Sequence, residues 1–321
     1  MLLTVFLLII ALVGLVVTAD RFVDGCAAIA SNYGVSPMII GVTIIGLGTS
    51  APEMLVSGIA AWEGNVGLAI GNALGSNIAN IGLILGITLL IKPIAIQTSI
   101  FRCELPALLF VTLGAYFLVS DYSLDQIDGV LLVVFLLGFL AWLIRLCIQQ
   151  NKSDPIVQEL EADIPNTMSN QSAFGWAITG LVGLVLSSKL LVWAAVSIAK
   201  AFGVSDLMIG LTIIALGTSL PELAASVASV LKNKADMAIG NVIGSNIYNL
   251  TAVLSIPALV APGALAAVVV ERDFLVMSVL SVLLVILVAD MFRCGKLGRI
   301  SGLILILIYS GYQFLLFQSI L

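Results

Sequence analysis

Ten stretches of apolar residues, each close to the length of one bilayer crossing, dominate this chain. A hydrocarbon core of about 30 Å requires about 20 consecutive apolar residues per transmembrane helix. Helices of that length satisfy their backbone hydrogen bonds internally, so we expect an all-α polytopic membrane protein. The predicted spans are 2–19, 38–61, 67–91, 104–120, 127–149, 174–199, 207–230, 236–260, 274–290 and 299–320.

The composition agrees with this fold class and excludes several kinds of chemistry. Hydrophobic types make up 61% of the residues and charged types only 10%, whereas soluble domains carry about 25% charged residues. The sequence contains no histidine, which excludes His-ligated zinc sites and histidine-based proton relays. Because no Gly-rich phosphate loop and no basic arm is present, we expect neither an organic cofactor nor a nucleic-acid partner.

An internal repeat divides the chain into two halves. Shifting the sequence by 169 positions aligns residues 36–87 with 205–256 without a gap and pairs GVTIIGLGTSAPE with GLTIIALGTSLPE. We predict a first five-helix repeat over 1–149, a polar cytoplasmic linker over 150–172 and a second five-helix repeat over 173–321. Since five is an odd number, the second repeat enters the membrane from the opposite side, and the two repeats are inverted.

Lysine and arginine residues are concentrated in the loops after the odd-numbered spans. Cytoplasmic loops carry such an excess, so these loops are expected to face the cytoplasm. Both termini should then lie outside, which means the periplasm for a protein of the cytoplasmic (inner) membrane of a Gram-negative cell.

Two acidic residues, Glu53 and Glu222, lie in the middle of apolar spans and occupy the same position of the repeat. An ionisable group at membrane depth costs about 2.5–3.5 kcal/mol or more, and it usually marks an ion or substrate path. A proline precedes each glutamate. Because proline lacks a backbone N–H, each helix should break at the membrane midplane and free carbonyl groups around residues 46–48 and 215–217.

Neutral oxygen atoms accompany both glutamates. Thr49 and Ser50 lie four and three residues before Glu53, while Ser76 and Asn80 are four apart on the next span, so each set lies on one helix face. The second half repeats these residues as Thr218, Ser219, Ser245 and Asn249. The other repeated amides lie off this face, and we interpret them as structural residues that cap or bridge helices: Asn72, Asn77, Asn241 and Asn246.

An all-oxygen set of this kind suits hard cations such as Ca²⁺ and Na⁺ and suits soft transition metals poorly. Two ionised glutamates carry a charge of −2, which one Ca²⁺ or two Na⁺ would neutralise. Mutually exclusive occupancy of one site by two ions is the physical requirement of an antiporter. Protonation of a glutamate could discharge the same site, so Ca²⁺/H⁺ exchange, or exchange of another divalent cation for protons, stays open.

Two other classes of protein fit these residues less well. A passive channel usually assembles its symmetric pore from several subunits, whereas this chain carries its pseudo-symmetry within one polypeptide. An intramembrane enzyme would need a nucleophile with an acid or base beside it, and Ser and Glu without His or Lys at the same depth offer little for hydrolysis. We therefore predict a transporter that functions as a single chain in the bilayer.

With GTSxPE and GSNIxN in each half, the sequence resembles a prokaryotic member of the sodium/calcium exchanger group in the calcium:cation antiporter superfamily. The resemblance implies Na⁺/Ca²⁺ exchange by alternating access, with four cation sites clustered at the midplane. It also implies that the first and sixth helices form a gating pair, and that Glu53 and Glu222 bind Ca²⁺ directly. The other implied ligands are Thr49, Ser50, Ser76, Asn80 and the Gly46 carbonyl in the first half, and Thr218, Ser219, Ser245, Asn249 and the Ala215 carbonyl in the second.

One departure from the family pattern concerns Asn80 and Asn249. Structurally known and animal members commonly have an aspartate at one of these two positions, whereas both are asparagine here. A third site carboxylate is therefore missing. Because an acidic residue there is associated with potassium coupling in one branch of the family, the resemblance argues against K⁺ dependence.

Overall fold

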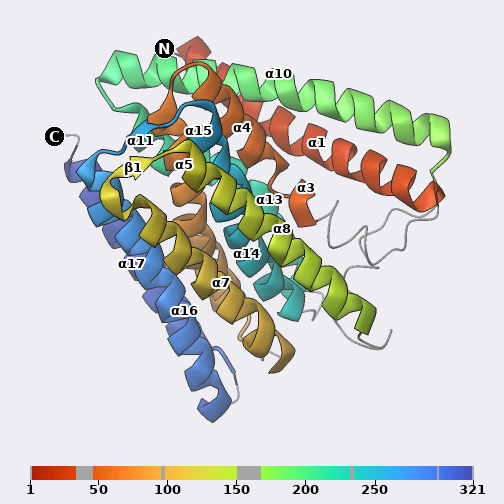
Figure 1. The fold of residues 1–321 in the computed structure, drawn as a ribbon, viewed down its shortest axis with the longest axis vertical. Helices are drawn as coiled ribbons and strands as arrows, with labels where there is room; N and C mark the ends of the chain where they lie inside the picture. The colour runs from red at the N-terminus through yellow and green to blue at the C-terminus, as the bar shows by residue number, and fades with distance from the viewer. Residues whose placement is uncertain are drawn as a thin grey trace.

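The structure is a computed structural model that describes residues 2–33, 46–94, 98–149, 168–231, 235–294 and 296–319. Within these ranges the chain is almost entirely helical, as Figure 1 shows. The helices of the first half are α1 (Leu2–Asn32), α3 (Gly46–Gly48), α4 (Ala51–Trp62), α5 (Val66–Ala79), α6 (Gly86–Ile91), α7 (Thr98–Leu118) and α8 (Gln126–Gln149). Those of the second half are α10 (Asn170–Phe202), α11 (Asp206–Ile209), α12 (Ala215–Thr218), α13 (Leu220–Leu231), α14 (Ala235–Tyr248), α15 (Ser255–Val260), α16 (Leu275–Cys294) and α17 (Arg299–Gln318).

Short segments of other geometry lie between these helices. A 3₁₀ turn, η3, covers Val119–Asp121, and two-residue strands form β1 (Ser123–Leu124) and β2 (Gly263–Ala264). The π-helical segments are η2 (Asn80–Leu85), η4 (Gly210–Ile214), η5 (Asn249–Val253) and η6 (Val269–Phe274).

Eight of the described helical spans are long and apolar enough to cross a membrane, and the bent pair Asp206–Thr218 with Leu220–Leu231 makes a ninth. The chain is therefore a multi-pass membrane protein. The predicted span 38–61 begins in residues 34–45, which lie outside the described residues, so the number of ten spans stays a prediction. Most of the predicted linker also lies outside them.

The first span is much longer than predicted. We expected residues 2–19, but α1 continues through Asp20 and Asp24 to Asn32, and its repeat counterpart α10 has 33 residues. At about 1.5 Å per residue, both helices exceed a hydrocarbon core of about 30 Å. The end of the apolar run did not predict the end of the helix, because packing between α1 and α10 continues past the charged residues. A Cβ on Gly180 of α10, for example, would collide with the backbone of Phe22.

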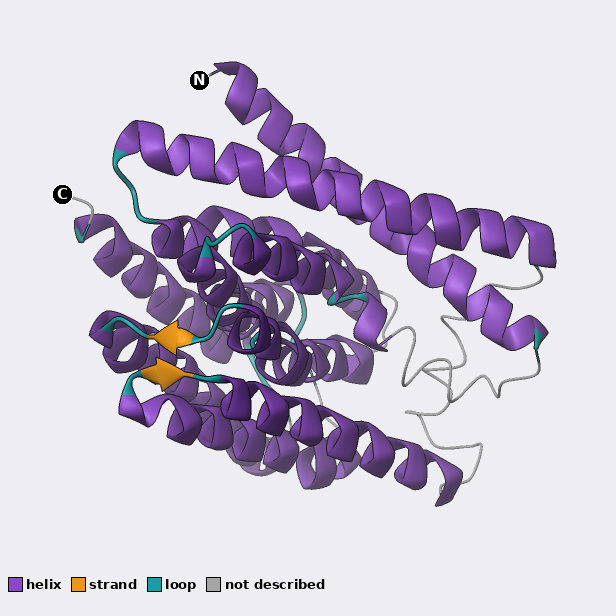
Figure 2. Cartoon of the chain, turned by 45° about the horizontal axis from the view of Figure 1, so that its top comes forward, coloured by secondary structure: helices purple, strands orange, loops and turns teal. Residues whose placement is uncertain are grey.

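Helices α1 and α10 cross each other along one side of the bundle, as Figure 2 shows. Small residues allow the close approach, and the contacts are reciprocal. A Cβ on Gly14 would lie 2.5 Å from Ser187 Oγ, and one on Gly183 would lie 2.5 Å from Thr18 Cγ2. Gly14 and Gly183 are repeat counterparts, and so are Thr18 and Ser187. The two halves thus meet through matching positions.

Two short backbone pairings tie the remaining helices together. Strand β1 pairs with β2 in antiparallel fashion, with Ser123 opposite Ala264. At a second place Ile94 and Leu297 exchange backbone hydrogen bonds of 2.9 and 2.6 Å. Leu297 lies just before α17 begins, whereas Figure 1 places β1 near the end of the bundle where α17 finishes. The two pairings therefore lie at opposite ends of α17.

Candidate cation-binding site

Each half contains a helix that is interrupted immediately before its buried glutamate. Helix α3 ends at Gly48 and α4 begins at Ala51, and in the second half only Ser219 separates α12 from α13, where the axis bends by 41°. Pro52 and Pro221 are each the second residue of the new helix. A proline is tolerated in that first turn because its missing N–H would have no intrahelical partner. The predicted proline breaks are confirmed at both places.

The two carboxyl groups of the site are buried inside the protein. Glu53 is fully buried and Glu222 is 1% exposed. Ser219 Oγ of the second half donates a long hydrogen bond of 3.4 Å to Glu53 Oε1. Ser245 Oγ is 3.5 Å from Glu222 Oε1. Both halves therefore contribute to one site.

Six oxygen atoms of the predicted ligand set are buried without any hydrogen-bond partner. They are Ser50 Oγ, Glu53 Oε2, Ser76 Oγ, Asn80 Oδ1, Glu222 Oε2 and Asn249 Oδ1. An unsatisfied buried polar group costs about 1–3 kcal/mol, so such atoms are rare in folded proteins. Oxygen atoms that lack donors in a dry, negatively charged interior are suited to ligate a hard cation. The unpaired atoms thus fit the predicted kind of site.

Four other predicted ligands are placed differently. Thr218 Oγ1 lies 3.1 Å from two acceptors of its proton, Asn72 Oδ1 of the other half and the Ile214 carbonyl of its own helix. The Ala215 carbonyl, which we expected to be freed by the proline, accepts the Ser219 N–H at 3.2 Å. That expectation was wrong, because the residue without an N–H is Pro221, two positions after Ser219, so the bond from Ser219 stays in place. Thr218 Oγ1 also lies 3.4 Å from the Ala215 oxygen. Gly46 is the first residue of α3, and Thr49 lies partly buried at the break.

The amides that we interpreted as structural do bridge helices. Asn72 Nδ2 of α5 donates to the Glu53 carbonyl at 3.1 Å and to Ser57 Oγ at 2.9 Å. Its repeat counterpart Asn241 makes the same two contacts, to the Glu222 carbonyl and to Ser226 Oγ. Sequence reasoning missed Ser57 and Ser226. Their identity at matching positions of the repeat was the available signal.

Sequence reasoning also missed the π-helical segments. η2 begins at Asn80 and η5 begins at its repeat counterpart Asn249. A π-bulge inserts one residue into a turn, and such bulges occur often at functional sites. Both predicted amide ligands therefore lie where the helix is wound differently from its neighbours.

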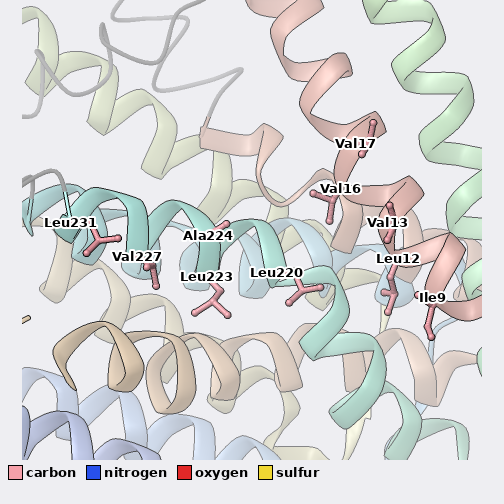
Figure 3. A pocket seen from close by; sticks show the side chains of 10 residues that line it. All are labelled: Ile9, Leu12, Val13, Val16, Val17, Leu220, Leu223, Ala224, Val227 and Leu231. Carbon is pink, nitrogen blue, oxygen red and sulfur yellow. The ribbon is translucent and has the colours of Figure 1, made fainter. Parts of the chain in front are cut away.

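An apolar groove of about 750 Å³ lies beside the second helix break, between α1 and α13. Figure 3 shows its aliphatic lining, with side chains of both helices along the groove. A Cβ on Gly217 would collide with Leu12, one of the lining residues. The equivalent helix of the first half, α4, packs against α10. The surroundings of the two breaks therefore differ although their sequences repeat.

In the part of the chain that the structure describes, the site has two carboxylates, those of Glu53 and Glu222. Among the described residues, no group of three or more His, Cys, Asp or Glu side chains is placed to hold a metal ion. Most ligands of a cation bound here would be neutral hydroxyl, amide and carbonyl oxygens. Such a site has low total charge, which suits an ion that must also leave.

Comparison with known proteins gives consistent results. The family model described as "Sodium/calcium exchanger protein" matches residues 3–145 and 172–318. The chain is 46% identical over 319 residues to the "Putative antiporter CaxA" of Alkalimonas amylolytica, covering 98% of this chain and 99% of that protein. It is 28% identical over 346 residues to the "Sodium/calcium exchanger MaX1" of Methanosarcina acetivorans, covering 97% of each.

A solved structure is also similar over nearly the whole chain. The sodium-calcium exchanger NCX_Mj, soaked with Na⁺ and Sr²⁺, superposes with a TM-score of 0.65 at 33% sequence identity. The match covers 96% of this chain and 97% of that one. The described helices therefore have the arrangement of that exchanger.

Proposed function

Because the chain belongs to the sodium/calcium exchanger protein family, we propose that it exchanges Na⁺ for Ca²⁺ across the cytoplasmic membrane by alternating access, with Glu53 and Glu222 as the central cation ligands. Membership of this family makes it a transporter of cations and not a catalytic enzyme. The similar proteins named as sodium/calcium exchangers support the choice of ions.

One observation carries the proposed site. Six predicted ligand oxygens, four in the first half and two in the second, are buried without a hydrogen-bond partner, and two of them belong to the buried carboxyl groups of Glu53 and Glu222. A single Ca²⁺ or a pair of Na⁺ ions would neutralise the charge of both carboxylates and satisfy these atoms. Both cations prefer oxygen ligands, so they would compete for the same atoms.

The differing surroundings of the two helix breaks support alternating access. Helix α4 packs against α10, whereas the groove separates α13 from α1. If the second half adopted the packing of the first, the groove would close. Opening α4 from α10 at the same time would expose the site from the other side, as inverted repeats allow.

The proposed topology has ten spans in two inverted repeats, with both termini outside. Reciprocal contacts between α1 and α10 support equivalent halves. The two backbone pairings support the inversion of the halves. Ile94 of one pairing is the repeat counterpart of Gly263 in the other, and the two pairings lie at opposite ends of α17. Cysteine labelling at positions before and after each span would test this topology.

Exchange of Ca²⁺ for protons is the second candidate. The observation in its favour is that Glu53 Oε2 and Glu222 Oε2 both lack a donor, so either could carry a proton when no cation is bound. Both candidates use the same atoms and differ in the driving ion.

The deciding experiment is uptake of radiolabelled Ca²⁺ into proteoliposomes. Vesicles loaded with Na⁺ are compared with vesicles that have only a pH gradient, for the wild type and for Glu53→Gln and Glu222→Gln. Glu63→Gln is the matched control, because Glu63 is an exposed acid directly after α4. We expect Na⁺-dependent uptake that both site variants abolish and the control retains.

Three results would change this conclusion. Uptake driven only by the pH gradient would establish the proton antiporter. Full activity of either site variant would refute the ligand assignment. Loss of activity in the Glu63→Gln control would show that removal of any acid near this helix is damaging.

A further inference from the structure

We propose that Asn246 is a positioning residue for the cation site, which holds Asn80 in the orientation that presents its carbonyl oxygen to the ion. This inference rests on the proposed function in one respect, namely that Asn80 ligates the transported cation.

Asn77 of α5 and Asn246 of α14 form a reciprocal bridge between the halves. Asn77 Nδ2 donates to the Asn246 main-chain carbonyl at 3.1 Å, and Asn246 Nδ2 donates to the Asn77 carbonyl at 3.4 Å. The two residues are repeat counterparts, and both are at most 1% exposed. Each amide group therefore supports the backbone of the opposite half one turn before a predicted amide ligand.

The side-chain oxygens of the bridge are used unequally. Asn246 Oδ1 accepts the Asn80 amide at 3.0 Å. The equivalent oxygen of the other half, Asn77 Oδ1, has no partner. Asn246 thus accepts a hydrogen bond through its side-chain oxygen, whereas its repeat counterpart Asn77 does not in this structure. Both residues donate to the main chain of the opposite half in the same way.

The bond to Asn246 determines which end of the Asn80 amide is available. A carboxamide has a donor end and an acceptor end. With its NH₂ group donated to Asn246, Asn80 keeps Oδ1 buried and unpaired. An NH₂ group turned toward the site would repel a cation, so the bond selects the orientation that can ligate one.

The position of Asn80 in the backbone makes such support necessary. Asn80 is the first residue of η2, where the helix is wound with the π-helical pattern. Asn80 is fully buried and so is its partner. A rotation of the Asn80 amide would leave the buried Asn246 oxygen unpaired as well, which makes the rotated state costly.

Equilibrium binding of radiolabelled Ca²⁺ to the purified full-length protein in detergent tests this role. The variants are Asn246→Ala, Asn80→Ala and the double variant, with Asn77→Ala as matched control. Asn77→Ala removes the same kind of main-chain bond as Asn246→Ala but leaves the acceptor of Asn80 in place. Thermal unfolding of each variant reports the purely structural loss.

We expect Asn246→Ala to raise the Kd for Ca²⁺ about fivefold, as the loss of one net hydrogen bond would do. Asn77→Ala should lower the unfolding temperature to a similar extent but leave the Kd close to wild type. In the Asn80→Ala background, Asn246→Ala should have no further effect on the Kd, because coupled residues are not additive.

Equal changes of Kd in Asn246→Ala and Asn77→Ala, or additive changes in the double variant, would overturn the positioning role. If Asn246→Ala does not fold, Asn246→Asp keeps an acceptor for Asn80, and a weakened Kd in that variant would contradict the proposal. Absence of Ca²⁺ binding to the wild type would instead refute the proposed function and with it the cation role of Asn80. The two failures are therefore distinguishable.

Discussion

Replacement of Gly75 by alanine should destabilise the protein, whereas the same change at its repeat counterpart Gly244 should not. Gly75 lies in α5 where this helix crosses η4 and α12. A Cβ there would lie 2.7 Å from the Ala215 Cβ and 2.8 Å from the Leu211 Cα and carbonyl oxygen. A Cβ on Gly244 would meet only one atom within 4 Å, Tyr248 Cε2 at 4.0 Å.

Two opposing effects set the magnitude. Exchanging glycine for alanine inside a helix stabilises it by about 0.5–1 kcal/mol. Overpacking costs about 1–3 kcal/mol, and the upper part of this range applies to Gly75, because two of the three atoms it would meet belong to backbone that no side-chain rotation can move. We expect Gly75→Ala to lower stability by about 1–2 kcal/mol and Gly244→Ala to raise it by about 0.5–1 kcal/mol.

Thermal unfolding in detergent, followed by intrinsic fluorescence, measures the difference. At about 2–4 °C per kcal/mol, the two variants should differ by several degrees, with wild type between them. Gly75→Ala should also weaken Ca²⁺ binding, since it displaces Ala215 at the second helix break. Equal shifts of the unfolding temperature in the same direction would refute the reasoning, because the two glycines share their sequence context and differ only in what surrounds them.

Two further predictions concern regions outside the ligand set. Tyr312→Phe removes a 2.8 Å hydrogen bond to the fully buried Asp273 carboxylate. This should lower the unfolding temperature by an amount equivalent to about 1.5–3 kcal/mol, while the Ca²⁺ affinity stays that of the wild type. An unchanged unfolding temperature would contradict the importance of this contact. Ala224→Leu fills the groove between α1 and α13. It should slow exchange in proteoliposomes without changing the Kd for Ca²⁺. A wild-type exchange rate would show that the groove does not need to close.

The sequence was sufficient to predict two buried glutamates and the helix break that precedes each of them. A glutamate in the middle of an apolar run costs free energy in the membrane, so it usually marks a functional site. The repeat has such a glutamate after a proline at two matching positions, Glu53 and Glu222. The breaks at Pro52 and Pro221 followed from the missing N–H alone. These inferences needed no knowledge of how the helices pack.

Properties that depend on contacts between the halves could not be predicted. The hydroxyl of Thr218 donates to Asn72, which lies on a different helix, so spacing along the chain gave no indication of it. The extension of α1 to Asn32 depends on packing against α10. The groove beside α13 was not predicted either, because it forms between two helices that are far apart in the sequence. Although α4 and α13 share Pro, Glu and Ser at matching positions, Leu55 of α4 is replaced in α13 by Ala224, one of the lining residues.

The reciprocal contacts between α1 and α10 have a consequence for the origin of the chain. Gly14 lies against Ser187 and Gly183 against Thr18, so each partner is the counterpart of the other, as in an isologous interface between identical subunits. A polypeptide of half this length could make the same interface with a second copy of itself. In such a homodimer every substitution would occur on both sides of the two-fold axis, whereas in the fused chain the halves can diverge independently. Asn77 and Asn246, identical in type but unequal in their bonds, show that even unchanged residues can take different roles within one polypeptide.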